Sequence, residues 1–259
     1  MRYIRYKYSN KIEYGILLEN KSIQSLKKMS YDVDEYNEIS NTPPISLRDV
    51  KLLSPCQPGK IIATAINYPG ATGLTANLDE PLVFIKPSSS VIGPNQTIIS
   101  PFKDTPVWGE PELAIVIGNK LSRATVSEAR NAIFGYTIGN DVSCENVHGW
   151  DHHLARSKGA DTFCVLGPWI DTEYNPNGKL IRGYHNETLI RSGYCQERLW
   201  KEPELLVWLS TWITLEPGDV VLTGAPSRLR DRKYFTENDI FTCEIEDLGE
   251  LKNPFKLIV

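Results

Sequence analysis

Short stretches in which apolar and polar residues alternate mark the beginning of the chain. They cover residues 3–8, 12–18 and 22–26 and are separated by polar turns. Alternation with a period of two is typical of strands that bury one face. Residues 28–48 are more polar and end in the turn-forming stretch 41–44, as in a linker. We therefore predict a small N-terminal β domain over residues 1–54 and a second domain over residues 55–259.

The second domain is also dominated by apolar runs with strand character. Two segments have helical character instead: residues 127–134, preceded by the capping-box pair Thr125 and Glu128, and residues 203–215. The glycines are too scattered to form a phosphate-binding loop. We predict a mainly β fold with some α structure, an α+β class, with strands at residues 61–66, 82–85, 97–99, 113–117, 136–138, 164–170, 220–223 and 240–245.

Composition narrows the functional classes. The 259 residues include 28 basic and 32 acidic side chains, so no basic surplus is available for nucleic acid or an anionic membrane. The five cysteines form no CxxC pair, which argues against a disulfide framework and a zinc ribbon and indicates a cytoplasmic protein. No apolar run approaches 18 residues, so we expect neither a signal peptide nor a membrane span.

Three carboxylates stand at the ends of predicted strands. Glu110 and Glu112 are two residues apart before an apolar run, which places both on one side of a strand. Asp141 follows the strand predicted at 136–138. Three oxygen ligands suit a hard cation such as Mg²⁺, Mn²⁺ or Ca²⁺. The same acids could equally be solvated or ion-paired, and their spacing alone leaves both interpretations open.

Longer motifs carry a resemblance to a known family. They lie at residues 58–62, 67–68, 84–90, 110–114, 135–143, 155–163, 166–169 and 217–224. In these motifs and their order, the chain resembles the fumarylacetoacetate hydrolase family, in the branch with a small extra N-terminal domain. The resemblance implies a mixed β-sandwich or β-roll around a central metal site, and a homodimer acting on a small molecule.

The resemblance also assigns roles to individual residues. It places the divalent-metal ligands at Glu110, Glu112 and Asp141 and the active-site lysine at Lys158. A cation at that position can stabilise the enolate of a β-dicarbonyl or 2-oxo acid. The supporting shell of the metal falls on Asp161 and Thr162, and we expect substrate contacts at Tyr68, Lys86, Thr223 and Arg228.

The water-activating pair of the hydrolytic members is missing. Ala71 and Leu74 stand where those members usually carry a histidine and a glutamate. Neither side chain can act as a general base. Hydrolysis by this route should therefore be lost or severely slowed.

A second departure from the family concerns the residues that bind the substrate. Many members carry an arginine and a glutamine where this chain has Glu145 and His148, and Ala225 replaces a threonine hydroxyl. The charge reversal predicts a substrate unlike the usual dicarboxylic acylpyruvates. His148 is a candidate for a relocated general base, with Glu145 beside it. Arg228 lies in an arginine-rich stretch that either reaches an anionic substrate or is a solvated loop.

These observations predict a metal-dependent enzyme that acts through an enolate. Without activated water, the expected chemistry is isomerisation, decarboxylation or cyclisation of a small β-dicarbonyl or 2-oxo acid. A carbon–carbon bond hydrolase that uses His148 as its base is one alternative. A non-catalytic binding protein is another, although retention of Lys158 and all three acids argues against it.

Overall fold

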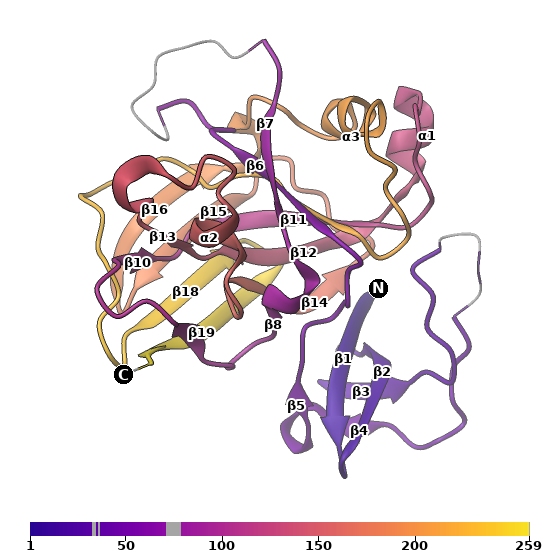
Figure 1. Cartoon of the computed structure of the whole chain (residues 1–259). Coiled ribbons are helices and arrows are strands. Elements are labelled where there is room, and N and C mark those ends of the chain that lie inside the picture. The colour runs from indigo at the N-terminus through magenta and orange to yellow at the C-terminus, as the bar shows by residue number, and fades with distance from the viewer. Residues whose placement is uncertain (33–34, 36, 71–78, 259) are drawn as a thin grey trace.

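The computed structural model describes residues 1–32, 35, 37–70 and 79–258, so Ala71 and Leu74 lie outside the described residues. Within the described part, the chain forms a 12-stranded sheet, a five-stranded sheet and a two-stranded ribbon, with few and short helices (Figure 1). This mainly β, α+β architecture confirms the predicted fold class. None of the helices in the described residues has the length and apolar character needed to cross a membrane.

The predicted N-terminal strands are confirmed. They are β1 (Arg2–Tyr8), β2 (Lys11–Leu17) and β3 (Ser22–Ser25), joined by the short β4 (Ile45–Ser46) and β5 (Lys51–Leu52). Their inward positions bury Ile4, Tyr6 and Ile23 in a small core of their own. This unit is the indigo part of Figure 1. The proposed boundary after residue 54 stays a prediction.

The N-terminal unit is not separate from the main sheet. Strand β1 pairs with β14 (Cys164–Asp171), where Arg2 lies opposite Asp171 and Tyr3 opposite Ile170. The sheet then continues through β12 (Ile133–Asp141), β11 (Pro111–Ile117), β17 (Val220–Leu222), β6 (Ile61–Ala65) and β7 (Leu82–Lys86), while β8 (Val91–Ile92) pairs beside β14. Every residue of β11 is buried, which explains its unbroken apolar run.

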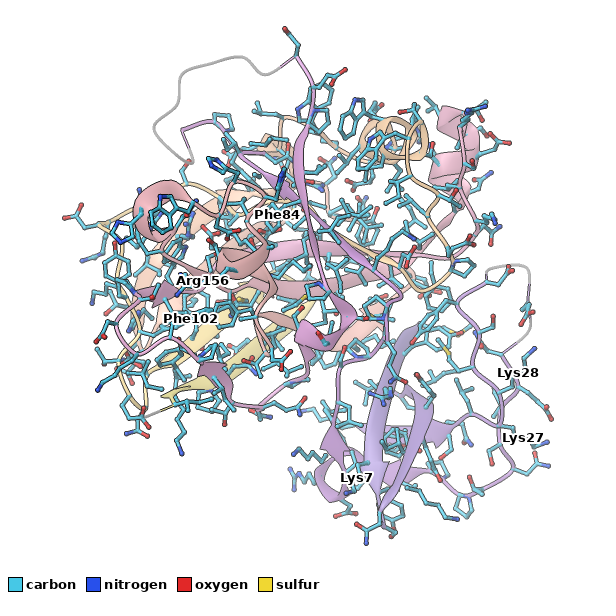
Figure 2. The ribbon with its side chains drawn as sticks, viewed as in Figure 1. Lys7, Lys27, Lys28, Phe84, Phe102 and Arg156 are labelled. Carbon is cyan, nitrogen blue, oxygen red and sulfur yellow. The ribbon has the colours of Figure 1, made fainter. Side chains whose placement is uncertain are left out.

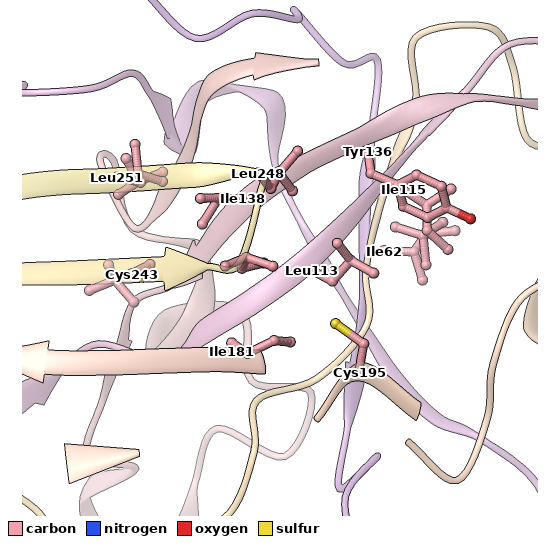
Figure 3. Packing of buried hydrophobic residues seen from close by; sticks show 14 of the residues in the cluster. Ile62, Leu113, Ile115, Tyr136, Ile138, Ile181, Cys195, Cys243, Leu248 and Leu251 are labelled. Atoms are coloured by element: carbon pink, nitrogen blue, oxygen red, sulfur yellow. The ribbon is translucent and has the colours of Figure 1, made fainter. Parts of the chain in front are cut away.

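The five-stranded sheet packs against this large sheet. It contains β16 (Thr188–Tyr194), β15 (Leu180–His185), β18 (Ile240–Ile245), β19 (Gly249–Leu257) and β9 (Ile98–Ser100). Leu113 and Ile138 of the large sheet meet Ile181 and Leu251 of the smaller one in a shared core (Figure 3). Full burial of each such side chain contributes about 1.5–3 kcal/mol. The core therefore fixes the ends of β11 and β12 that carry the predicted site.

The helices are shorter than the sequence indicated. Helix α1 (Val126–Asn131) has the predicted capping box, but it stops early because residue 133 already belongs to β12. Helix α3 (Glu204–Ser210) likewise covers only part of residues 203–215. Helix α2 (Ala155–Gly159) was not predicted as a helix. Single 3-10 turns complete the described chain: η1 (Leu47–Asp49), η2 (Ser88–Ser90), η3 (Val147–Gly149) and η4 (Cys195–Glu197).

Candidate active site

A small cavity of about 190 Å³ lies where strands of the large sheet end. Its wall includes Glu110, Glu112, Asp141 and Lys158, so the four residues predicted to form the site centre come together. The ribbon of β10 (Val107–Trp108) and β13 (Ser143–Cys144) closes one side. The volume is below the about 300–1,000 Å³ of pockets for drug-sized ligands, so the cavity suits a small metabolite.

The register of β11 and β12 brings the carboxylates together. Pro111 lies opposite Asn140 and Glu112 opposite Gly139 in the antiparallel pair. One step further, the Asp141 amide donates to the Glu110 carbonyl at 3.0 Å. The Asn140 side chain accepts from the Glu110 amide at 2.9 Å, which fixes the chain just before β11. Residues 30 positions apart in sequence thus become neighbours at one sheet edge.

Glu112 is held by backbone rather than by a cation. The Gly224 N–H donates to Glu112 Oε2 at 2.6 Å. Gly224 adopts φ +88°, and a Cβ there would lie 2.8 Å from Asn67 Cβ. Glycine is therefore required at this position for both conformation and close approach. Within the described residues, no lysine or arginine lies within ion-pair distance of Glu112.

The other two carboxylates each bind two cations. Lys158 of α2 donates to Glu110 Oε2 at 2.9 Å, to Asp141 and to the Ser143 hydroxyl. Lys86, which is fully buried, binds the other oxygen of Asp141. Arg191 of β16 donates to Glu110 Oε1 at 2.6 Å. Such buried, charge-assisted hydrogen bonds orient the carboxylates rigidly.

An aromatic ring adds to this environment of Lys158. Phe84 of β7, labelled in Figure 2, has its ring centroid 4.9 Å from Lys158 Nζ. A ring face attracts a cation, by about 0.5–2 kcal/mol depending on solvent exposure. Phe84 therefore helps to hold the ammonium group in the cavity wall.

Burial and neighbouring charges shift the pKa values of these groups in opposite directions. Burial alone would lower the pKa of Lys158, but Asp141 and Glu110 outweigh it and raise that pKa, so the lysine stays protonated. Burial raises the pKa of Glu110, yet Lys158 and Arg191 reverse the effect and lower it strongly. Burial, followed by repulsion from Asp141 and Glu110, raises the pKa of Glu112 well above its usual range.

The three carboxylates supply oxygen atoms, the type of ligand that suits a hard divalent cation. Among the described residues, no three His, Cys, Asp or Glu side chains are grouped closely enough to hold a metal ion, and the Lys158 ammonium binds both Glu110 and Asp141. Nevertheless, three carboxylates line one small cavity, and no lysine or arginine of the described chain lies within ion-pair distance of Glu112. Oxygen donors of this type are those that Mg²⁺, Mn²⁺ and Ca²⁺ prefer.

Several other predicted residues lie outside the cavity wall. Tyr68 is buried, and its hydroxyl has no hydrogen-bond partner among the described residues. Thr223 donates its hydroxyl to the Leu113 carbonyl and so ties β17 to β11. Asp161 is exposed, and Thr162 exchanges hydrogen bonds with the backbone of residue 99. Within the described part of the chain, none of these four side chains forms a hydrogen bond with Glu110, Glu112 or Asp141.

The two residues that stand in place of the substrate-binding arginine and glutamine, Glu145 and His148, do not line the cavity. His148 is exposed, has φ 63°, and its ring lies 5.4 Å from that of Trp150. Glu145 Oε2 lies 3.9 Å from Arg232 Nη1. Arg232, in contrast, lines the cavity. Arg228 lies on the same loop as Arg232 but outside the cavity wall; it lines a surface hollow that Arg232 also borders.

Sequence reasoning missed two large side chains of the cavity wall, Trp108 and Arg191. Arg191 stands among strand residues, 81 positions from its partner Glu110, so no local pattern reveals the contact. Arg232 was expected only as one of the three arginines, with Arg228 and Arg230, that either reach an anionic substrate or form a solvated loop. The spacing could not show which of the three lines the cavity.

Comparisons with known proteins agree with this geometry. The family model described as fumarylacetoacetate (FAA) hydrolase C-terminal matches residues 60–256. The chain is 34% identical over 232 residues to the mitochondrial oxaloacetate tautomerase fahd2 of Xenopus laevis, covering 83% of this chain and 71% of that protein. The crystal structure of 5-carboxymethyl-2-hydroxymuconate delta-isomerase from Mycobacterium smegmatis superposes with a TM-score of 0.90 at 31% identity, covering all of both chains.

A more distant structure contains a metal. Maleylpyruvate hydrolase from Sphingobium sp. SYK-6, solved in complex with manganese(II) and pyruvate, has a TM-score of 0.79 and 22% identity, with 99% of both chains covered. At this identity the likeness shows the fold alone. The manganese and pyruvate belong to that protein.

Proposed function

This chain belongs to the fumarylacetoacetate hydrolase family, and from that premise we propose that it is a divalent-metal-dependent enzyme that isomerises a small 2-oxo or β-dicarbonyl acid. The preferred reaction is interconversion of keto and enol forms. The observation that carries the proposal is the protonated Lys158, held among three carboxylates in the wall of a small cavity. The relatives named as an oxaloacetate tautomerase and a hydroxymuconate isomerase support it.

Each residue has a distinct role in this proposal. Glu110, Glu112 and Asp141 would hold Mg²⁺, with Mn²⁺ or Ca²⁺ as substitutes. The bound cation would polarise a substrate carbonyl as a Lewis acid. The ammonium of Lys158 donates a hydrogen bond to the oxygen on which negative charge develops. Lys158 donates hydrogen bonds to Glu110, Asp141 and Ser143 in this structure, so we assign it as a donor and not as the base that removes a proton.

The surroundings favour isomerisation over hydrolysis. Hydrolysis needs a base that activates water, and residues 71 and 74 are alanine and leucine. His148, the candidate substitute, is exposed and does not line the cavity. Burial raises the pKa of the nearby Cys144 to about 11, so its thiol is not an activated nucleophile. Isomerisation moves a proton between carbon and oxygen and adds no water.

Oxaloacetate provides the first test. The protein is stripped with EDTA and reloaded with Mg²⁺, and decay of the enol absorbance is compared with Mg²⁺ alone. We expect faster decay with the loaded protein and a product of unchanged mass. Loss of Lys158 as an oxyanion donor, in Lys158→Met, should reduce the rate about 10²–10³-fold.

Other products would identify other reactions. Loss of carbon dioxide would indicate decarboxylation, loss of water from a suitable keto amide would indicate cyclisation, and gain of water by an acylpyruvate would indicate hydrolysis. No acceleration with any of the three metals would overturn the proposed tautomerase activity.

A further inference from the structure

Arg232 occupies a distinctive position in the cavity wall. Its guanidinium carbon lies over the Trp108 ring, 3.8 Å from the ring centroid, within the range of a cation–π contact. Its Nε is buried and has no hydrogen-bond partner among the described residues. The indole Nε1 of Trp108 is also buried without a partner in the described part of the chain. Two adjacent residues of the wall therefore hold unused hydrogen-bond donors.

The other cations around the cavity are already engaged. Lys158 binds Glu110 and Asp141, and Lys86 binds Asp141. Arg191 binds Glu110 and also donates to the carbonyl of residue 226. Of the lysines and arginines that line the cavity in the described structure, Arg232 alone has no ion pair with a cavity carboxylate. Its one acidic neighbour, Glu145, lies at the edge of ion-pair distance and outside the wall.

The electrostatic environment at this end of the cavity favours an anion. Arg228, Arg230 and Lys233 lie on the same loop as Arg232. Asp231 lies on this loop too, but three of these four charged neighbours of Arg232 are cations, so the loop carries a net positive charge. A buried donor without an acceptor is unfavourable until an acceptor binds.

We propose that Arg232, held over the ring of Trp108, binds a carboxylate of the substrate and makes this enzyme select acids over neutral dicarbonyls. The inference rests on the proposed function, whose substrate class it narrows. The inference also accounts for Glu145. Many family members carry an arginine at the position of Glu145, whereas here the positive charge comes from Arg232 on another loop. Glu145 Oε2 lies 3.9 Å from Arg232 Nη1. Glu145 is then a positioning residue.

Arginine suits this task better than lysine. Its planar guanidinium stacks on an aromatic ring and presents parallel donors to both oxygens of a carboxylate. An ammonium group at the same place would keep the charge but lose the stack and the paired geometry. Arg232→Gln removes the positive charge. Arg232→Lys keeps the charge and removes the planar paired donors, so it tests their contribution alone. Arg230→Gln is the matched control, because Arg230 is exposed on the same loop and does not line the cavity.

The direct test is calorimetric titration of the Mg²⁺-loaded protein with malonate and with the uncharged dicarbonyl acetylacetone. A hydrogen bond to a charged group contributes about 1.5–3 kcal/mol, so Arg232→Gln should weaken malonate binding about 10–100-fold. Arg232→Lys should lie between this variant and the wild type, and Arg230→Gln should match the wild type. Acetylacetone should bind all four proteins equally.

Three results would overturn the inference. The first is unchanged malonate affinity in Arg232→Gln, and the second is no malonate binding by the wild type. The third is an equal loss of acetylacetone affinity in Arg232→Gln, which would show a distorted cavity. The oxaloacetate assay separates this inference from the proposed function. Malonate discrimination without turnover would refute only the function, and turnover with unchanged malonate affinity in Arg232→Gln would refute only the role of Arg232.

Discussion

Gly224→Ala is expected to destabilise the protein through a contact that cannot relax. The added Cβ would lie 2.8 Å from Asn67 Cβ and 3.2 Å from the Thr64 carbonyl oxygen. Asn67 is buried and fixed by hydrogen bonds of its side chain to the backbone of Trp200 and Thr223. It therefore cannot move aside without breaking those bonds.

The magnitude has two parts. A non-glycine residue at φ +88° costs about 1–2 kcal/mol. Overpacking against a rigid neighbour costs about 1–3 kcal/mol more. We expect a loss of about 2–5 kcal/mol in the free energy of unfolding, a large share of the about 5–15 kcal/mol that stabilises a typical domain. Displacement of the Gly224 amide would also release Glu112 and reduce activity.

Gly178→Ala supplies the matched control. Gly178 has φ +75°, but a Cβ there would meet nothing within 4 Å. This variant should lose only the conformational part, about 1–2 kcal/mol. Urea unfolding of both variants measures the difference between their free energies of unfolding, provided that this free energy depends equally on urea concentration in both. Equal destabilisation of the two variants would refute the packing argument.

Three further predictions concern individual groups. Burial raises the pKa of Asp239, but hydrogen bonds from Thr236, Asn186 and His185 outweigh this and lower it to about 2. A lowered pKa means that its stabilising contribution is present above pH 4 and is lost as pH falls toward 2, so acid unfolding of Asp239→Asn should depend less on pH in that window. Cys144, buried and with a pKa raised to about 11, should resist iodoacetamide at pH 8 in the native protein and react after unfolding. Lys158→Met should lose enol decay about 10²–10³-fold while its far-ultraviolet circular dichroism stays native.

Each of these predictions has a result that contradicts it. The Asp239 argument fails if wild type and Asp239→Asn unfold with the same pH dependence between 4 and 2. Rapid native alkylation of Cys144 would show that its thiol is accessible and ionised. Full activity of Lys158→Met would remove the lysine from the proposed chemistry.

The alternation of residues was enough to predict the local elements. It located the first three strands, and the Thr125–Glu128 spacing located the capping box of α1. It could not give the pairing of β1 with β14, because strand partners 160 or more residues apart leave no local pattern. Helix α2, which carries Lys158, begins after Leu154 in a left-handed conformation with no side-chain cap, so the usual start signal is missing.

The site was predictable only where motifs carried it. Glu110, Glu112, Asp141 and Lys158 line one cavity, as the family resemblance implied. The resemblance could not single out Arg232 from Arg228 and Arg230, because the loop that carries them departs from the family pattern. The sequence showed that Glu145 replaces a positively charged residue of the family. Only the folded chain shows that Arg232 lies near Glu145. The homodimer, the cytoplasmic location and the identity of the metal stay predictions.

The central claim is that three carboxylates hold a cation that acts with Lys158 on an enolisable acid. Glu112→Gln tests it most directly. The glutamine keeps a side-chain oxygen that accepts from the Gly224 N–H, and it removes a carboxylate that Asp141 and Glu110 repel. The measurement is the rate of oxaloacetate enol decay against Mg²⁺ concentration, with unfolding followed in parallel. The account predicts that Glu112→Gln folds at least as stably as the wild type but loses the Mg²⁺-dependent rate. A Mg²⁺ response equal to that of the wild type would contradict it.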